Sequence, residues 1–429
     1  MGVETGSILT LDIEKPAAGG RMLARHHGQV AFVSGAIPGE RVSARVERVT
    51  KGLIFAETIA VEASSPDRRP VESDWRCGGN VLAHVAYPRQ LHLKGEILKD
   101  AFGRIARVPL PVVPDVIGSP QHGYRMRARL HVHDGRVGFY REGTHHLCGA
   151  AQTGQLLPET NDWLSHVQDV LEAAPASVYG VLAAIDIAEN VAGTERACHL
   201  ELHAGADASR YAMLAEGLVG LSAQTIDSAR VERLAGTPSI ADTLRVGEDG
   251  SMTLRLERDV RAFFQGNRFL LERLVRHVTD LVPSGPVVDL YAGVGLFGLS
   301  LAVAGRGPVT LVEGDPVSGA DLEVNARPFA DHLRVERSSV ETYLARHPTM
   351  PSTSTFLVDP PRTGMSKDAM AGFLAARPQT LVYVSCDVAT LARDTRLLLD
   401  AGYELGQLTG IDLFPNTAHV ETVASFVRR

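Results

Sequence analysis

The stretch of sequence that decides the fold is Val287-Val288-Asp289-Leu290-Tyr291-Ala292-Gly293-Val294-Gly295-Leu296-Phe297-Gly298. An apolar run that contains one acid and is followed at once by glycines is typical of a buried parallel strand that turns tightly into a helix. Ligands bind beyond the carboxyl ends of the strands in such α/β sheets. We therefore expect the loop around Gly293 and Gly295 to bind a cofactor.

The glycine loop alone does not identify the ligand. Gly293, Gly295 and Gly298 also fit the G-x-G-x-x-G dinucleotide pattern, and Glu313 lies where a ribose-binding acid is expected. A methyl donor, NAD(P), another ligand and a tight turn without a ligand are the alternatives. Asp289, before the first glycine, favours a cationic methyl donor, and Glu313 would suit ribose hydroxyls in either case.

Strands and helices alternate after about residue 261, which predicts an α/β domain with a parallel sheet. A helix is expected over residues 267–281. Apolar strands are expected at residues 287–291, 309–313, 356–359 and 381–385. The last two strands, 403–414 and 420–427, leave no room for a helix between them, so we expect an antiparallel hairpin. A parallel sheet that ends in such a hairpin is typical of class I methyltransferases.

Two further loops carry chemistry at the same expected edge of the sheet. Asp359-Pro360-Pro361-Arg362 follows one strand, and its prolines stiffen the loop that holds an acid and a guanidinium. Cys386 follows the next strand. A lone cysteine after a buried strand is more often an inert core residue. Its place beside the other two loops, and a helix expected from about Ala389, favour a nucleophile whose pKa is lowered toward neutrality.

The chain before residue 261 predicts two other regions. Residues 1–64 alternate apolar and polar positions between glycine turns, as in a small OB-like antiparallel barrel. After a turn-rich joint, residues 71–260 mix helix and strand, with a helix over 90–105 and a hairpin over 125–140. We expect three domains: a barrel (1–64), a mixed α+β central domain (71–260) and the sheet domain (261–429).

Charge and composition bound the function. The net charge of −7 argues against coating nucleic acid through bulk electrostatics, but residues 86–150 hold ten Lys/Arg against five Asp/Glu. That stretch is either a site for a polyanion or a solvated basic face. No apolar run has the length of a membrane helix, and the start has no secretory pattern. The four cysteines lie far apart, so we expect no disulfide framework and a reducing, cytoplasmic location.

Several motifs together resemble the RNA uracil-5-methyltransferase family. They occupy residues 264–267, 289–298, 359–364, 384–394 and 414–421. Residues 35–42 are similar to a TRAM domain, the RNA-binding barrel of members that act on ribosomal RNA. The resemblance covers nearly the whole chain and is weakest over 150–255. It implies an S-adenosylmethionine-dependent enzyme that methylates uridine, with 23S ribosomal RNA favoured over transfer RNA and no obligate protein partner.

The resemblance also implies roles for individual residues. Cys386 would add to carbon 6 of uracil, and Glu421 would remove the proton from carbon 5. Asp359 and Arg362 would position the substrate. The residues expected to bind the donor are Gln265, Asp289, Tyr291, Gly293, Gly295, Glu313 and Asp359. Without the motif, Glu421 would be interpreted as a surface residue of an edge strand.

The sequence departs from the family at a cluster site. Many relatives hold an iron–sulfur cluster on four cysteines, but here only Cys77 matches, with Val71 and Asn80 at the flanking positions. The fourth ligand is expected near Thr153, and Cys148 is out of register. Too few thiolates remain for a cluster, so we predict none and no other metal. Val388 replaces a proline, and Ser339 stands where an acid often contacts the donor's adenine.

Three other functions compete with uridine methylation. An NAD(P)-linked oxidoreductase would leave Asp359, Cys386 and Glu421 without roles. A cytosine-5 methyltransferase would carry a second cysteine in the Asp359 loop, and none is present. A non-catalytic RNA-binding protein that keeps the fold is the third, and it would bind RNA equally well without Cys386.

Overall fold

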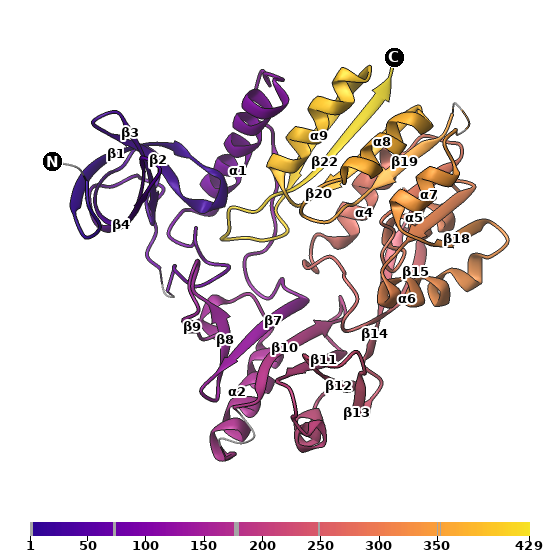
Figure 1. Ribbon diagram of the computed structural model, residues 1–429, viewed down its shortest axis with the longest axis horizontal. Coiled ribbons are helices and arrows are strands. Elements are labelled where there is room, and N and C mark those ends of the chain that lie inside the picture. The colour runs from indigo at the N-terminus through magenta and orange to yellow at the C-terminus, as the bar shows by residue number, and fades with distance from the viewer. Residues whose placement is uncertain (1–2, 72–73, 176–179, 248, 350, 352) are drawn as a thin grey trace.

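The computed structural model describes residues 3–71, 74–175, 180–247, 249–349, 351 and 353–429. Within them the chain forms a closed five-stranded barrel, a seven-stranded sheet, a two-stranded ribbon and an eight-stranded sheet (Figure 1). The predicted α/β class with a small N-terminal barrel is confirmed. The barrel is indigo and the C-terminal half of the eight-stranded sheet is yellow in Figure 1.

The barrel has the strand order β1-β2-β3-β5-β4. Its strands are β1 (Ile8–Pro16), β2 (Met22–His26), β3 (Gln29–Ser34), β4 (Arg41–Thr50) and β5 (Leu53–Ala63). Alternate residues such as Leu11, Val33 and Val42 are buried inside it, as the period-2 pattern predicts. Glu40 is also buried and pairs with Arg68 at 2.6 Å, which fixes the exit of the chain.

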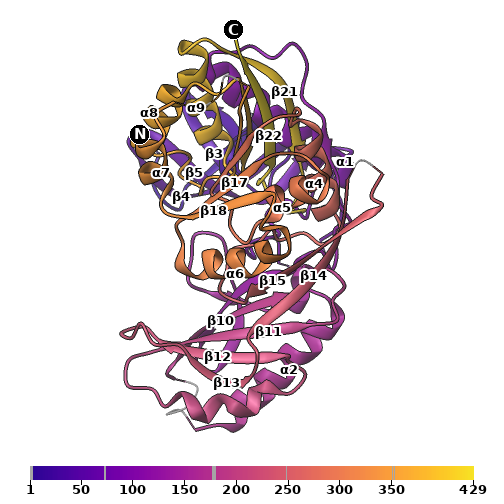
Figure 2. The same cartoon turned by 90° about the vertical axis from the view of Figure 1, so that its right-hand side faces the viewer.

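The central sheet has the order β13-β12-β11-β10-β7-β8-β9 (Figure 2). Its strands are β7 (Arg127–His133), β8 (Arg136–Tyr140), β9 (Leu147–Cys148), β10 (Leu182–Glu189), β11 (Arg196–Leu202), β12 (Gly220–Thr225) and β13 (Glu232–Gly236). Helix α2 (Pro158–Ala173) buries Trp163 and Val167 in one core with strand residues such as Leu200. The predicted hairpin turns at Asp134, whose φ of 52° is left-handed.

A two-stranded ribbon, β14 (Ser239–Val246) and β15 (Met252–Asp259), joins the central sheet to the larger one. Arg258 is fully buried there and pairs with Asp242 at 2.8 Å. Arg268, just before the first helix of the large sheet, pairs with Glu189 of β10 at 2.6 Å. Arg258 also donates to the Glu189 carbonyl at 2.7 Å, so both arginines connect the ribbon and the segment before α4 to β10 of the central sheet.

The eight-stranded sheet has the order β18-β17-β16-β19-β20-β22-β21-β6, in which the edge strand β6 is Val116–Ile117. Its strands in this region are β16 (Val287–Leu290), β17 (Val309–Glu313), β18 (Leu333–Arg337), β19 (Thr355–Val358), β20 (Thr380–Ser385), β21 (Tyr403–Ile411) and β22 (Glu421–Arg428). The first five are parallel, and β22 is antiparallel to both β20 and β21. The predicted parallel sheet with a C-terminal antiparallel hairpin is therefore confirmed.

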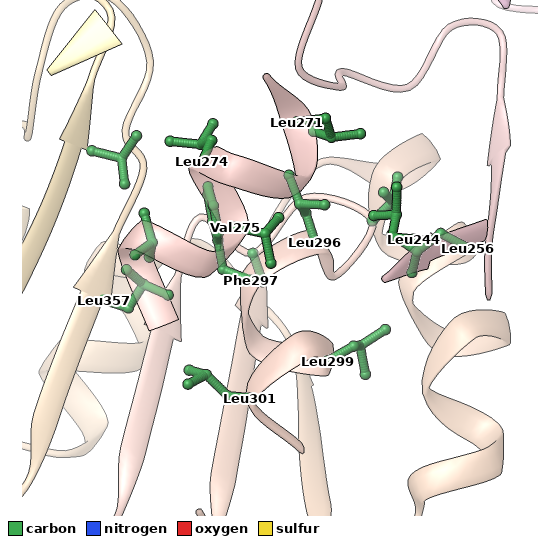
Figure 3. Packing of buried hydrophobic residues seen from close by; sticks show 14 of the residues in the cluster. Leu244, Leu256, Leu271, Leu274, Val275, Leu296, Phe297, Leu299, Leu301 and Leu357 are labelled. Atoms are coloured by element: carbon green, nitrogen blue, oxygen red, sulfur yellow. The ribbon is translucent and has the colours of Figure 1, made fainter. Parts of the chain in front are cut away.

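Helices cover this sheet on both faces. They are α4 (Leu271–Asp280), α5 (Leu296–Val303), α6 (Pro316–Ala326), α7 (Val340–Arg346), α8 (Lys367–Ala376) and α9 (Val388–Asp400). Figure 3 shows side chains of α4 and α5, among them Leu274 and Phe297, packed together close to Leu357 of β19. Because α5 begins directly after Gly295, this apolar packing also holds the glycine turn in place.

One helix and one strand from earlier in the chain also join the eight-stranded sheet. Helix α1 (Tyr87–Ala101) packs against α9, and β6 (Val116–Ile117) pairs with β21. Both fall in the range 71–260 that the sequence assigns to the central domain. The division at residues 64 and 260 remains a prediction.

Among the described residues, no helix has both the length and the apolar character that are needed to cross a bilayer.

Candidate functional site

A cavity of about 890 Å³ lies between the carboxyl edge of the parallel strands and the central sheet. The sequence-predicted site residues that line it are Gln265, Tyr291, Gly293, Glu313, Asp359, Arg362, Cys386 and Glu421. Asp289 and Gly295 do not line it, but they lie in the strand and turn that form its floor. The structure thus brings residues from six separate segments to one place.

Strand pairing places Cys386 beside Glu421. Ser385, the last residue of β20, is the register partner of Thr422 in β22. Because these strands are antiparallel, the residue after Ser385 and the residue before Thr422 lie next to each other at the end of the ladder. A sulfur and a carboxylate therefore face the cavity from adjacent strand ends.

Asp359 follows β19, which lies between β16 and β20 in the sheet. Gln265 donates a hydrogen bond from Nε2 to Asp359 Oδ2 at 3.0 Å. Burial raises the pKa of Asp359 to about 7, and the Gln265 bond acts in the opposite direction. Pro360 is buried and gives the loop no backbone donor, so Gln265 supplies the bond that fixes this carboxyl.

The glycine turn is held by Asp289 from inside. Gly298 donates its backbone N–H to Asp289 Oδ2 at 2.9 Å, while Oδ1 is buried without a hydrogen-bond partner. Burial, followed by the charges of Asp359 and Glu313, raises the pKa of Asp289 well above its usual value. A side chain at position 298 would place its Cβ 2.8 Å from Asp289 Oδ2, so the close approach requires glycine.

Glu313 ends β17 and braces the same turn. Its carboxyl accepts from the backbone N–H of Gly293 at 2.7 Å and of Asp315 at 2.6 Å. Gly293 is left-handed, with a φ of 58°, and has open space where a Cβ would be. An acid beside an open backbone turn, above a buried carboxyl oxygen that lacks a partner, fits a cationic nucleoside donor. These residues could therefore hold S-adenosylmethionine.

The expected activation of Cys386 by a helix N-terminus is wrong. Helix α9 does begin two residues later, but burial raises the pKa of the thiol to about 11, with further contributions from Glu421 and Asp359. The end of the helix is capped by Asp387, whose side chain accepts from the Thr390 N–H at 2.9 Å. Burial and nearby acids therefore outweigh the helix.

Glu421 is a buried carboxyl, with 3% of the residue exposed. Burial, and then the neighbouring Asp359, raise its pKa well above the usual value. Its Oε1 has no hydrogen-bond partner. A buried, underbonded carboxyl of raised pKa at the wall of a cavity can accept a proton from a bound substrate.

Arg362 is the most exposed of the predicted site residues, with 70% of its side chain accessible. Its Nε lies 3.7 Å from Asp387 Oδ2, so the guanidinium leans across the mouth of the cavity toward the Cys386 loop. An exposed guanidinium with one distant partner is free to bind a phosphate.

The residues of the opposite wall were not among the predicted site residues, although the sequence gives residues 86–150 as either a polyanion site or a solvated basic face. It comes from the central sheet and from the segment before α4, and includes Arg127, Arg129, Tyr140 and Phe263. The Arg127 guanidinium lies 5.8 Å from the centroid of the Phe263 ring. The signal was present in the sequence, because arginines at alternate positions of a strand share one face.

The sequence predicts no disulfide framework, but the structure has one disulfide. Cys77 and Cys148 form a disulfide, which links the segment after the barrel to the short strand β9. Cys148 therefore pairs with Cys77 although it is out of register with the family's fourth cysteine. The site does not fit an iron–sulfur cluster, because both thiols are used and Val71, Asn80 and Thr153 provide no thiolate.

Known proteins are similar to this chain over almost its entire length. Residues 2–59 match the TRAM domain, and residues 348–429 match the family described as tRNA (Uracil-5-)-methyltransferase. A 23S rRNA (uracil(1939)-C(5))-methyltransferase RlmD of Chromohalobacter salexigens is 32% identical over 447 residues, covering 97% of this chain and 89% of that protein. The RlmD of Shewanella amazonensis is 29% identical, covering 95% of this chain and 93% of its own.

A solved structure shares the fold. It is the tRNA (uracil-54, C5)-methyltransferase of Pyrococcus abyssi in complex with S-adenosyl-L-homocysteine, with a TM-score of 0.76 and 23% identity. The match covers 97% of this chain and 99% of that one.

Proposed function

Because the chain belongs to the RNA uracil-5-methyltransferase family, we propose that it transfers a methyl group from S-adenosylmethionine to carbon 5 of a uridine in RNA. The observation that carries the proposal is the pairing of β20 with β22, which brings Cys386 and Glu421 together in the cavity that the glycine turn also lines. An oxidoreductase has no use for this pair.

The proposed mechanism uses the two residues in sequence. The Cys386 thiolate adds to carbon 6 of uracil, and the electron pair of the 5,6 double bond makes carbon 5 a nucleophile. The bound donor supplies an electrophilic methyl group for that carbon. Glu421 then takes the proton from carbon 5, the double bond re-forms, and the bond between Sγ and carbon 6 breaks. Cys386 leaves as a thiolate, and Glu421 holds the proton until solvent removes it.

The remaining site residues would bind the methyl donor and orient the uracil. We propose that Glu313, at the end of β17, accepts hydrogen bonds from ribose hydroxyls. Gln265, Asp289, Tyr291, Gly293, Gly295 and Asp359 would surround the rest of the donor. Asp359 would also help to orient the uracil, and Arg362 at the mouth would bind a phosphate of the RNA. The uridine must leave its stack to reach Cys386, so the substrate presents it in a loop or flips it out.

Ribosomal RNA, in particular 23S rRNA, is the substrate we propose first. Two similar full-length relatives are named as 23S rRNA methyltransferases, and the TRAM domain at residues 2–59 supports RNA binding. Transfer RNA is the second candidate, because the family matched at residues 348–429 is described by that substrate. A cytoplasmic location, where these RNAs are modified, is part of the proposal.

Two variants test the proposal. Cys386→Ala should abolish formation of 5-methyluridine, measured by mass spectrometry of nuclease-digested RNA, and should leave RNA binding within about twofold. Glu421→Gln should stop after methyl transfer and leave protein bound to RNA through Cys386, visible as a denaturation-resistant band. Methylation by Cys386→Ala at the wild-type rate would refute the covalent mechanism.

A further inference from the structure

The segment that carries the proposed base is fixed from outside the sheet domain. Residues 412–420 connect β21 to β22, and Glu421 is the first residue of β22. Its last ladder partner is Ile411, so the pairing of the two strands ends at Glu421 itself. Since Glu421 Oε1 accepts no hydrogen bond, the position of this carboxyl depends on how the preceding backbone is held.

Asn416 is the centre of one set of contacts in this segment. Gln90 of α1 donates from Nε2 to Asn416 Oδ1 at 3.0 Å and accepts the Asn416 backbone N–H at 2.9 Å. Arg69 donates to the same Oδ1 at 2.8 Å. Leu82 donates its backbone N–H to the Asn416 carbonyl at 2.8 Å.

Asn416 also has a backbone that few residues adopt easily. Its φ is 64°, in the left-handed region, where asparagine and glycine are the usual residues. Gln90 is fully buried and Asn416 is 5% exposed, so water does not replace these bonds when they are lost. The amide pair thus locks a tight turn five positions before the base.

A second set of contacts holds the start of the segment. Lys94 of α1, fully buried, pairs with Asp412 and donates to the Phe414 carbonyl at 3.0 Å. Tyr87 donates its hydroxyl to Asp412 Oδ2 at 2.9 Å. Gln90, Lys94 and Tyr87 of these two sets belong to α1, which packs against α9 and β21 (Figure 1).

From this arrangement we propose that Gln90 and Asn416 are positioning residues, which fix Glu421 for proton removal from carbon 5. The proposal rests on the proposed function. It makes α1, which lies more than 300 positions earlier in the chain, a part of the active site's frame. Neither residue is among those that line the cavity. They act through the backbone that leads to Glu421.

The reaction separates this role from a general loss of structure. Glu421 is needed only after methyl transfer, so misplacing it slows release of RNA from Cys386 and leaves adduct formation intact. A variant that folds poorly, or binds donor or RNA weakly, loses adduct and product in parallel. The diagnostic quantity is therefore the fraction of protein in the denaturation-resistant adduct, divided by the single-turnover rate of methyl transfer.

The test uses Gln90→Leu and Asn416→Gly in the full-length protein, the second chosen because glycine keeps the left-handed backbone. The substrate is in vitro transcribed 23S rRNA with S-adenosylmethionine. Each variant should raise the adduct fraction at least fivefold over wild type, with the single-turnover rate within about threefold. Gln168→Leu is the matched control, because Gln168 makes three hydrogen bonds in the central domain away from the segment. It should show the wild-type adduct fraction.

The outcomes are distinguishable from failure of the function itself. If Glu421→Gln accumulates adduct while both positioning variants keep the wild-type fraction, the positioning proposal is overturned and the proposed function stands. A parallel fall of adduct and methyl-transfer rate in both variants also overturns it. If neither wild type nor Glu421→Gln methylates or traps any uridine, the proposed function fails first.

Discussion

Gln265 and Asp359 are joined by a hydrogen bond of 3.0 Å across the cavity, from the segment before α4 to the end of β19. No backbone N–H from Pro360 or Pro361 is available to that carboxyl, because proline lacks one. The orientation of Asp359, and its protonation, therefore depend on a side chain 94 positions away.

Gln265→Leu should weaken donor binding. Loss of one hydrogen bond to a buried acid costs about 1–1.5 kcal/mol, which corresponds to roughly a fivefold to tenfold rise in Kd. Isothermal titration calorimetry with S-adenosyl-L-homocysteine at pH 7.5 measures it. Gln379→Leu removes an amide that bonds to the Arg428 carbonyl, away from the cavity, and should leave Kd unchanged. Equal affinities in wild type and Gln265→Leu would contradict the assignment of Gln265 to the donor site.

Asp359 should make the free protein less stable as the pH rises. Burial raises its pKa from 3.8 to about 7. Between about pH 4 and pH 7 the folded chain binds more protons than the unfolded chain. The contribution of the protonated Asp359 to the free energy of unfolding is therefore complete below about pH 4 and is lost as the pH rises past 7. Asp359→Asn cannot titrate at this position. The free energy of unfolding of the variant, measured relative to that of wild type, should therefore be higher at pH 8 than at pH 5 by roughly 1–3 kcal/mol.

Urea unfolding at pH 5 and pH 8 provides the measurement. Asp331→Asn, at an exposed position, changes the charge equally and serves as the control. The same pH dependence in wild type and Asp359→Asn would show that another group is responsible.

The thiol of Cys386 should react slowly until its acidic neighbours are removed. Burial, Glu421 and Asp359 raise its pKa to about 11, so little thiolate exists at pH 8. Glu421→Gln removes one negative neighbour and should lower the pKa, which speeds iodoacetamide labelling at pH 9 by roughly threefold to tenfold. Peptide mass spectrometry follows the modification, and the fully buried Cys198 serves as an unreactive reference in each sample. Labelling at the same rate in wild type and variant would mean that Glu421 does not influence the thiol.

The sequence predicts the parallel strands well because burial on both faces leaves continuous apolar runs. β18 is missed, since Leu333 and Val335 are only partly buried at the edge of the sheet and alternate with charged residues. The contribution of α1 and β6 is also missed, because β6 pairs with β21 over two residues nearly 300 positions away.

The site was predicted less completely than the sheet. Each loop could be placed at the carboxyl edge, since parallel strands end there together. The raised pKa of Cys386 could not be predicted from the sequence, because it depends in part on Glu421 and Asp359, which reach the thiol from other segments. The opposite wall with Arg127 and Tyr140 requires knowledge of how two sheets meet, which periodicity does not contain.

The disulfide gives the last prediction. Cys77 and Cys148 are 71 positions apart, and cross-linking a loop of that length stabilises a folded chain by up to about 4 kcal/mol in the chain-entropy description. The double variant Cys77→Ser/Cys148→Ser should therefore unfold at lower denaturant than the oxidised wild type.

In dithiothreitol the wild type should lose most of this advantage, because its own disulfide is reduced, while the variant should not respond. The measurement is guanidinium unfolding with and without the reductant. Mass spectrometry of the unreduced Cys77–Cys148 peptide pair verifies that the bond is present. Gly78 and Gly79 follow Cys77 directly and line the cavity, so reduction should also loosen that wall and raise the KM for RNA more than it lowers kcat. A wild type whose unfolding curve is identical with and without dithiothreitol would show that this bond contributes nothing to the stability of the fold.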